Sequence, residues 1–316
     1  HTRLRTVTGV QTWLFRSRPA VSLVATPTKR RAMIELAVEI ERRGFAGIAC
    51  PSLGATMSLC TSLAHETSTI RFWTSIQPIY YNHPFELGNT AAHIHEISGG
   101  RFSLGLGVSH APVTKRLGVE VARPLSDIER YVEQMRANER FSGALPPILL
   151  ATLRDKMLAL AMRIADGAIW ANAALSAIPR QVAATANARD GFTLSNMIPT
   201  VIDDDVNAAR AVNRKTLTGY VILPNYRNYW RAAGYVAEME ALEATIATSP
   251  KESLGEALVA TMSDAWLDDC TISGPPAHVR DRLEAWAATG VQPIAVMSST
   301  SGGQAKAIGE LFAAYQ

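Results

Sequence analysis

Two kinds of apolar pattern alternate along the chain: short continuous runs, and longer stretches in which apolar residues recur every three or four positions. The run at residues 21–25, for example, precedes a stretch whose apolar face consists of Met33, Leu36, Ala37 and Ile40. Short runs are typical of buried strands, and the longer spacing is typical of amphipathic helices. Strands that alternate with helices in this way predict the βαβ units of a parallel sheet.

The number of these runs decides between two parallel architectures. We expect eight strands, at residues 21–25, 46–50, 71–76, 102–106, 147–151, 167–171, 194–201 and 292–297. Eight strands close a (β/α)8 TIM barrel, and this α/β fold is our prediction. A doubly wound open sheet is the alternative, but its G-x-G-x-x-G fingerprint is missing, because His110 stands where a third glycine should follow Gly105 and Gly107.

The connection between the last two expected strands is much longer than the others. It predicts a helical insertion at about residues 206–271, within a single domain that spans residues 1–316. The insertion carries an aromatic group around the turn LPNYRN, made of Tyr220, Tyr226, Tyr229, Trp230 and Tyr235. We expect these side chains to pack the inserted helices on the barrel, and a lid over an active site or a dimer contact are the alternatives.

Composition and charge narrow the class of ligand. Of the 316 residues, 47% are apolar and 19% are charged, and 31 Lys and Arg against 28 Asp and Glu leave a formal net charge of +3. The basic residues are interleaved with acidic ones and form no long cationic run. We therefore expect neither a nucleic acid nor a membrane as partner, and predict a small-molecule substrate.

The cysteines and the apolar runs indicate a compartment. Cys50, Cys60 and Cys270 are odd in number and show no C-x-x-C spacing, so neither a disulfide framework nor a thiolate metal site is predicted. No run approaches the roughly 18 to 20 apolar residues of a membrane span, and residues 1–19 lack the apolar region of a signal peptide. These features predict a cytoplasmic protein.

The carboxyl ends of the strands carry the chemistry in a barrel of this kind, and few residues there are ionisable. The lack of paired carboxylates, of a Ser-His-Asp set and of clustered metal ligands favours a bound organic cofactor. His110 directly follows a strand in a glycine-containing loop, so it is the candidate for proton transfer or anion binding, with a purely structural loop role as the alternative. We expect surface or helix-packing roles for His65, His93, His95 and His278.

Two other groups near strand ends have structural interpretations. The aspartates at residues 203–205 are of a type that binds cations, but they precede an expected helix at Val206 and are predicted to cap it. Gly302 and Gly303 precede the final expected helix, where many barrels hold a phosphate. Because glycines commonly follow strands, this pair alone is a weak signal.

A resemblance to a known family is visible in the centre of the chain. Residues 74–113, TSIQPIYYNHPFELGNTAAHIHEISGGRFSLGLGVSHAPV, resemble the centre of the bacterial luciferase-like monooxygenase superfamily, and GRFSLGLGVSHAP is a fairly specific phrase within it. Four later stretches resemble an actinobacterial branch of predicted coenzyme F420-dependent oxidoreductases: RPLSDIERYVEQM, RIADGAIW, LPNYRNYWRAAGY and GPPAHVRDRLEAWAATGV. The similarity covers nearly the whole chain from about Val21 onward.

The resemblance implies a (β/α)8 barrel with a helical insertion before the last strand, often dimeric, that holds a flavin or deazaflavin across the strand ends. We therefore expect a homodimer, and a non-proline cis peptide between Ser75 and Ile76 that supports the cofactor ring. The loops after the fourth and fifth strands correspond to segments that contact the ring or its phosphorylated tail. No metal ligand is predicted, and the predicted cofactor-binding residues are Thr26, Ser75, Ile76, Gly107, Val108, Ser109, His110, Ala151, Thr152 and Leu153.

The chain departs from its relatives at two places. Better-known deazaflavin dehydrogenases carry an Asp-His pair just after the second strand, where this chain has Ser52 and Leu53. Many relatives have a glycine-rich loop after the fifth strand, where this chain reads ATLRDKM, so the phosphate contacts there are altered. Arg154 or Lys156 could compensate by charge, and a solvated position at the start of a helix is the alternative for both.

The sequence is compatible with three functions. The leading hypothesis is an oxidoreductase that transfers a hydride between F420 and a small organic substrate, with His110 as the catalytic proton carrier. An FMN-dependent luciferase-like monooxygenase, which needs a partner reductase and molecular oxygen, is the alternative within the enzymes. A non-catalytic flavin- or deazaflavin-binding protein is the third possibility, because the strand ends offer so few acid–base groups.

Overall fold

The computed structural model describes residues 18–119, 121 and 123–316. The first seventeen residues, on which part of the argument against a signal peptide rests, lie outside the described residues. None of the described helices combines the length and the hydropathy that a membrane crossing requires.

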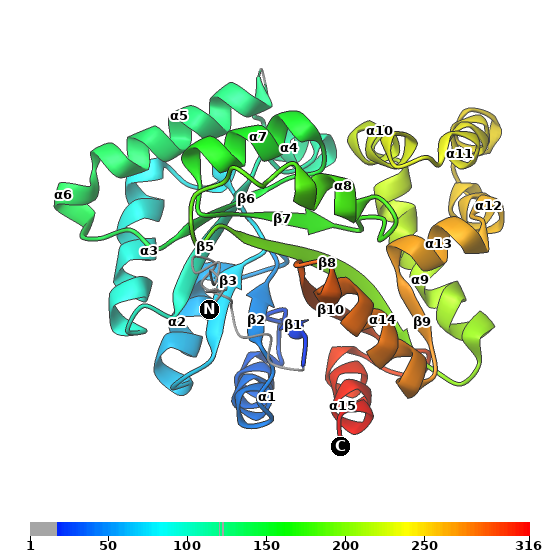
Figure 1. The fold of residues 1–316 in the computed structure, drawn as a ribbon, viewed down its shortest axis with the longest axis horizontal. Helices are drawn as coiled ribbons and strands as arrows, with labels where there is room; N and C mark the ends of the chain where they lie inside the picture. Colours follow the sequence, from blue (N-terminus) through cyan, green and yellow to red (C-terminus); the bar gives the residue numbers. More distant parts are fainter. Residues whose placement is uncertain (1–17, 120, 122) are drawn as a thin grey trace, which may run out of the picture.

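Parallel strands close into a barrel (Figure 1). Around the barrel they are Ala20–Ser22 (β1), Gly47–Cys50 (β2), Arg71–Thr74 (β3), Phe102–Gly107 (β5), Ile148–Ala151 (β6), Gly167–Ala171 (β7), Thr193–Ile202 (β8) and Gln292–Ser298 (β10). The last strand closes the circle, because β10 pairs with β1 on one side and with β8 on the other. The predicted (β/α)8 barrel is confirmed, and the open sheet is excluded.

Two further strands were not predicted from the sequence. Gln77–Pro78 (β4) continues the path of β3 and pairs with the end of β5, and Ile272–Gly274 (β9) pairs with the carboxyl end of β8. Both are too short to show the alternating pattern on which a strand prediction depends. The strand β9 follows the last of the inserted helices and leads the chain back to the barrel.

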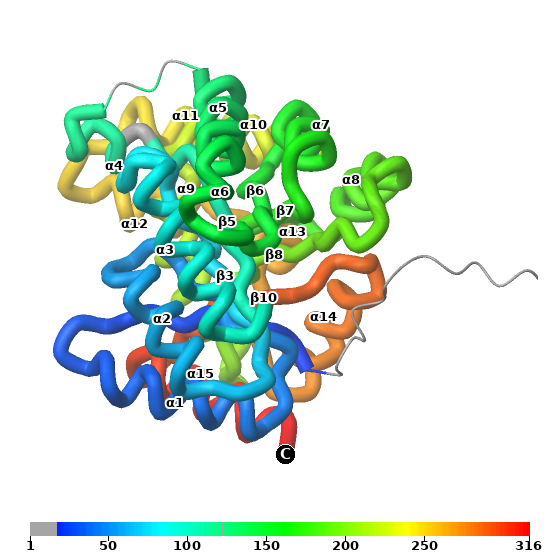
Figure 2. Tube along the Cα trace, turned by 90° about the vertical axis from the view of Figure 1, so that its left-hand side faces the viewer, coloured from blue at the N-terminus to red at the C-terminus, as the bar shows by residue number. Residues whose placement is uncertain are grey.

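Helices connect the strands and surround the barrel (Figures 1 and 2). They are Arg30–Arg42 (α1), Thr56–Glu66 (α2), Ile79–Tyr81 (the 3-10 helix η1), Pro84–Ile97 (α3), Ala111–Arg116 (α4), Pro124–Ala137 (α5), Glu139–Ser142 (α6), Asp155–Ile164 (α7), Ile178–Ala183 (α8), Val206–Val221 (α9), Pro224–Ala232 (α10), Val236–Thr248 (α11), Leu254–Thr261 (α12), Asp264–Cys270 (α13), Pro276–Ala288 (α14) and Gln304–Ala314 (α15). In Figure 1, α9 to α13 gather on one side of the barrel, and α5 and α6 lie on the other.

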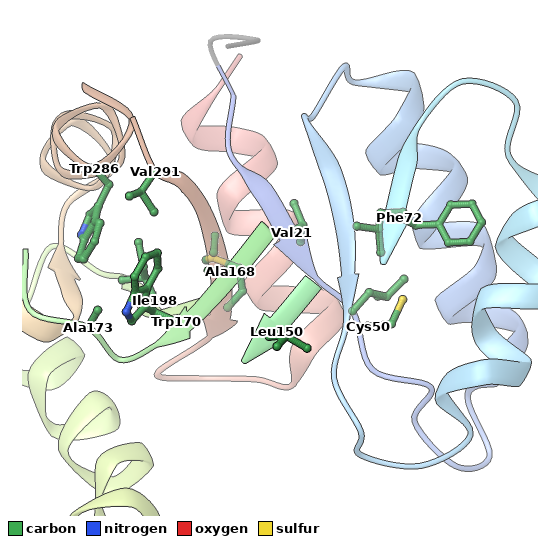
Figure 3. Packing of buried hydrophobic residues seen from close by; sticks show 14 of the residues in the cluster. Val21, Cys50, Phe72, Leu150, Ala168, Trp170, Ala173, Ile198, Trp286 and Val291 are labelled. Atoms are coloured by element: carbon green, nitrogen blue, oxygen red, sulfur yellow. The ribbon is translucent and has the colours of Figure 1, made fainter. Parts of the chain in front are cut away.

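The strands bury side chains on both faces, which produces two layers of core. Alternate residues such as Val21, Phe72 and Trp170 belong to a large cluster between the strands and the helices, part of which Figure 3 shows. Their neighbours point the other way and form a separate cluster that fills the barrel: Ala20, Ala49, Trp73, Leu149, Ile169 and Ile294. A filled barrel is a rigid support on which only the carboxyl ends of the strands are left for a ligand.

The inserted segment is helical between residues 206 and 270, as expected. Asp205 begins α9 by accepting hydrogen bonds from the N–H groups of Asn207 and Ala208, so its predicted capping role is confirmed. Part of the aromatic group packs the insertion on the barrel, because Trp230 is fully buried and its Nε1 donates to the carbonyl oxygen of Asn172 after β7. The Trp230 ring also meets that of Trp266 at a centroid distance of 4.9 Å.

Arg101 fastens the opposite, amino-terminal end of the barrel. Its guanidinium donates hydrogen bonds to the carbonyl oxygens of Ala64, Thr67, Ile70 and Ser98, at 2.8 to 3.0 Å, and to the Thr67 hydroxyl. These acceptors lie at or beyond the carboxyl ends of α2 and α3, where helical carbonyls lack partners within the helix. A single side chain in the phrase GRFSLG thus joins two helices to the start of β5.

Candidate active site

The predicted cofactor-binding residues follow the carboxyl ends of four strands, β1, β3, β5 and β6. Thr26 follows β1, and Ser75 and Ile76 follow β3. The remainder end or follow β5 and β6: Gly107, Val108, Ser109, His110, Ala151, Thr152 and Leu153. Three of these strands are neighbours in the order β3-β5-β6, whereas β1 is separated from β3 by β2. The fold therefore groups the loops after β3, β5 and β6 and leaves Thr26 two strands away.

Ile76, Gly107 and Ala151 lie against one another at this end of the barrel. A Cβ atom added to Gly107 would lie 2.6 Å from Ile76 Cδ1 and 3.1 Å from Ala151 Cβ. Only a glycine at this position lets the Ile76 side chain rest on the backbone of β5. The peptide bond between Ser75 and Ile76 is cis, as the resemblance implies.

Gly105, two residues earlier in β5, has a structural role. A Cβ atom there would lie 2.0 Å from the carbonyl oxygen of Thr74. The Thr74 hydroxyl also donates a 2.7 Å hydrogen bond to the Gly105 carbonyl oxygen, so β3 and β5 approach each other closely at this point. The two glycines of the phrase GLG thus have different roles. Gly105 allows the close contact between β3 and β5, and Gly107 accommodates the Ile76 side chain.

His110 lies at the amino-terminal end of α4, just after Ser109, which has a positive φ of 62°. Its ring is largely buried, and its Nδ1 has no hydrogen-bond partner among the described residues. Burial lowers the pKa of the His110 imidazole below its ordinary value of 6.5, and no charged neighbour contributes to the shift. Neutral imidazole is therefore the prevailing form near neutral pH, and it can accept a proton.

Two tyrosines of the insertion lie beside His110. The Tyr226 ring is 5.7 Å from the His110 ring between centroids, the Tyr220 ring is 6.5 Å away, and the two tyrosine rings are 5.0 Å apart. Desolvation raises the pKa of both phenols, so both stay protonated at neutral pH. The sequence placed these residues in the packing of the insertion and did not place them beside His110. The turn LPNYRN is the signal that could have suggested this contact with His110, because aromatic residues are concentrated around it.

The loop after β6 carries a second buried polar atom without a partner. Thr152 is 3% exposed, and its Oγ1 has no hydrogen-bond partner among the described residues. The carbonyl oxygen of Leu153 is held by Gln181 Nε2 at 2.9 Å, which fixes the loop on α8. Arg154 and Lys156 are exposed at the start of α7, where they are free to turn toward a ligand or toward solvent.

The other strand-end residues have little to offer a reaction. Leu53 is 67% exposed, and Ser52 beside it has no acid–base function at neutral pH. Asp203 accepts a 2.5 Å hydrogen bond from the Thr300 hydroxyl, which lowers the pKa of its carboxyl. In the part of the chain that the structure describes, no three His, Cys, Asp or Glu side chains are grouped as metal ligands would be. The arrangement suits an organic ring that lies on Ile76 and meets isolated polar atoms.

Known proteins resemble this chain in sequence and in fold. The family model described as luciferase-like monooxygenase matches residues 12–293. A 5,10-methylenetetrahydromethanopterin reductase of Archaeoglobus fulgidus is 24% identical over 286 residues, which cover 79% of this chain and 83% of that protein.

Two solved structures show how widely the fold is shared. The coenzyme F420-dependent tetrahydromethanopterin reductase of Methanopyrus kandleri superimposes with a TM-score of 0.74 at 17% identity, over 93% of this chain and 97% of that one. The oxygenating constituent of 3,6-diketocamphane monooxygenase of Pseudomonas putida, in complex with FMN, gives a TM-score of 0.61 at 14% identity, over 94% of this chain and 96% of that one. At these identities the likeness shows the barrel fold alone.

Proposed function

The chain belongs to the luciferase-like monooxygenase family, and we propose that it is an oxidoreductase that transfers a hydride between coenzyme F420 and a small organic substrate. The observation that carries the proposal is the apolar surface of Ile76, Gly107 and Ala151, flanked by two buried polar atoms without partners. These atoms are His110 Nδ1 and Thr152 Oγ1. A mostly apolar surface with a few unpaired polar atoms is typical of cofactor sites.

The residues present fit the proposed cofactor. Ile76 would support one face of a planar ring, and that face is left unobstructed because Gly107 has no side chain and that of Ala151 is small. Thr152 Oγ1 and the backbone after β6 would hold polar groups of the ring or the tail. Ser75 precedes Ile76, and its hydroxyl contacts the Met197 sulfur at 2.9 Å. This contact helps to fix the backbone that carries the apolar surface. Thr26, Val108, Ser109 and Leu153 complete the proposed cofactor-binding set.

The deazaflavin supplies the hydride chemistry when bound, and the protein supplies position and one proton carrier. His110 is the proposed catalytic residue. Its neutral imidazole accepts the proton of an alcohol substrate as that substrate is oxidised, and the imidazolium returns the proton in the reverse direction. The rings of Tyr220 and Tyr226 lie beside the imidazole, whose burial lowers its pKa.

One comparison and one feature of this chain favour F420 over FMN. The Methanopyrus kandleri structure is of an F420-dependent reductase, and its TM-score exceeds that of the FMN complex. The altered loop ATLRDKM after β6 also leaves charge at Arg154 and Lys156 for the longer, acidic F420 tail. An FMN-dependent monooxygenase is the second candidate, which the family description and the FMN complex favour.

Binding affinities test the choice of cofactor. We expect F420 to bind at least about tenfold more tightly than FMN, a difference of about 1.4 kcal/mol. The purified protein should be titrated with each cofactor while the fluorescence of the cofactor and of the tryptophans is followed. Equal affinity, or tighter binding of FMN, would make the monooxygenase the better assignment. Failure of both cofactors to bind would reject cofactor chemistry at this site altogether.

The proposal also covers the oligomeric state and the cellular location of the protein. We propose a homodimer, as the resemblance implies, and a cytoplasmic location. Light scattering during size-exclusion chromatography distinguishes the dimer from a monomer of 34.2 kDa.

A further inference from the structure

The hydroxyls of Tyr220 and Tyr226 differ from those of several other tyrosines in the molecule. Tyr80 donates to Asp127, Tyr131 donates to the Asn82 carbonyl oxygen, and Tyr235 donates to Asp269. Among the described residues, no such acceptor is found for the protons of Tyr220 and Tyr226, and the Tyr315 hydroxyl near the C-terminus also lacks a partner. Of these three tyrosines, Tyr220 and Tyr226 have rings that lie beside His110, at the candidate active site.

Tyr220 is the better placed of the two to meet a ligand. Tyr226 is 5% exposed and lies deeper, against the Trp230 ring at a centroid distance of 5.5 Å. Tyr220 is only partly buried; desolvation raises the pKa of its phenol, and the Asn172 side chain, just after β7, opposes part of that rise. A donor that stays protonated, lies at the edge of the site and has no acceptor is available to an oxygen of the substrate.

We propose that the Tyr220 hydroxyl is a substrate-binding group that donates a hydrogen bond to a carbonyl or alcohol oxygen contacted also by His110, and that the site selects uncharged substrates. This inference rests on the proposed function, since it names the substrate class of that same site. No bond is made or broken by Tyr220 in it. Tyr220 orients the oxygen, while His110 exchanges the proton.

Selection against charge follows from the surroundings of the three rings. The groups that face His110 from α9 and α10 are the phenols of Tyr220 and Tyr226, and both stay uncharged at neutral pH. No carboxylate or cation contributes to the pKa shift of His110. A carboxylate or an ammonium group brought here would lose its hydration without gaining a partner of opposite charge, which is costly.

The inference is tested by the binding of four probes of one size and different charge. They are cyclohexanone, cyclohexanol, cyclohexanecarboxylate and cyclohexylammonium. Each is added to the full chain, with and without F420, while the ring resonances of isotopically labelled histidine are followed by NMR. The His110 signal is assigned by its loss in His110→Gln. We expect the two neutral probes to shift that signal and the two charged probes to bind at least about tenfold more weakly.

A variant pair separates the role of the hydroxyl from that of the ring. Tyr220→Phe keeps the ring contacts and removes the donor, so it should weaken the neutral probes by about fivefold, as expected for one hydrogen bond. Tyr235→Phe removes a hydroxyl bonded to Asp269 in the insertion and should leave probe binding unchanged. In turnover with F420, Tyr220→Phe should raise KM more than it lowers kcat.

The outcomes distinguish this inference from the proposed function. Neutral probes that bind equally to wild type and Tyr220→Phe, charged probes that bind as well as neutral ones, or no binding of neutral probes would each overturn it. The affinity for F420, measured separately by fluorescence, should stay within about twofold in Tyr220→Phe. If F420 fails to bind to wild type while neutral probes still shift His110, the cofactor assignment is wrong and the substrate assignment stands.

Discussion

Residues at the end of β5 have either a structural or a functional role, and the sequence pattern does not show which role each one has. His110 directly follows a strand in the sequence, and this was enough to predict that it lies at the carboxyl end of the barrel. Its two aromatic neighbours come from residues more than a hundred positions later, and no local pattern relates them to it. Residue-scale tests therefore address the histidine and the glycines that precede it.

Replacing His110 tests its proposed catalytic role. His110→Ala should leave the fold intact, because the ring contributes to a loop and makes no hydrogen bond through Nδ1. Loss of a general acid–base group typically costs about 10² to 10⁴ in rate, so turnover should fall far outside assay error. Turnover and cofactor binding close to wild type, with an unchanged melting temperature, would assign His110 a structural loop role only.

The same variant has a pH signature in stability. Because the folded-state pKa of His110 is lowered below 6.5, the unfolded chain binds more protons in the window between the two pKa values. The free energy of unfolding of the wild type should therefore fall as the pH is lowered through that window. His110→Ala should lack this part of the loss, which urea unfolding at about pH 7.5 and about pH 5.5 would measure.

Gly105 and Gly107 form a matched pair of substitutions. Gly105→Ala places a Cβ on the backbone carbonyl of Thr74, which cannot move without separating β3 from β5, so it should lower stability by about 3 kcal/mol or prevent folding. Gly107→Ala meets the flexible end of Ile76, so the fold should survive while the displaced Ile76 side chain weakens cofactor binding. Thermal melts and cofactor titrations of both variants check this. Equal loss of stability in the two would contradict it.

At the scale of elements, the sequence predicted the barrel strands well and the contacts of the insertion poorly. The spacing of Met33, Leu36, Ala37 and Ile40 predicted a buried helix face, and in α1 all of them are buried except Leu36, which is partly buried. Helix and strand periods are local properties, so they can be read without a structure. The position of Tyr220 over β7 depends on how α9 and α10 cross the barrel end, which is set by tertiary packing. Consequently the aromatic group was predicted as packing, with a lid over the active site or a dimer contact as alternatives, and its contact with His110 in particular was not predicted.

Arg101 offers a test at the same scale. Arg101→Lys keeps the charge but replaces a planar fork with a single ammonium, which cannot reach acceptors in both α2 and α3 at once. We expect a loss of about 2 kcal/mol in stability, since buried carbonyls lose their donors. Cofactor binding should not change, because Arg101 lies at the amino-terminal end of the barrel. Chemical unfolding and the F420 titration give the two readouts, and a stable variant with weakened cofactor binding would contradict the assignment.

At the scale of the whole molecule, stability and chemistry lie at opposite ends of one barrel. The phrase GRFSLGLGVSH runs the full length of β5, from Arg101 at one end to His110 at the other. The resemblance that rests on it thus combines a structural signal with a functional one. The family and the fold could be predicted from such a phrase, whereas the identity of the cofactor depends on tail contacts that the loop after β6 has altered.

Closure of the barrel by β10 has a consequence for how the protein is made. The first strand pairs with residues 294 and 295 on one of its sides, so that edge has no partner until those residues have been synthesised. At about 5 to 20 residues per second, this wait lasts roughly 15 to 60 seconds. An unpaired strand edge is a template for association with another chain, so nascent copies on neighbouring ribosomes are exposed to one another throughout that time. We therefore expect shielding of β1 by chaperones during synthesis to raise the yield of folded protein.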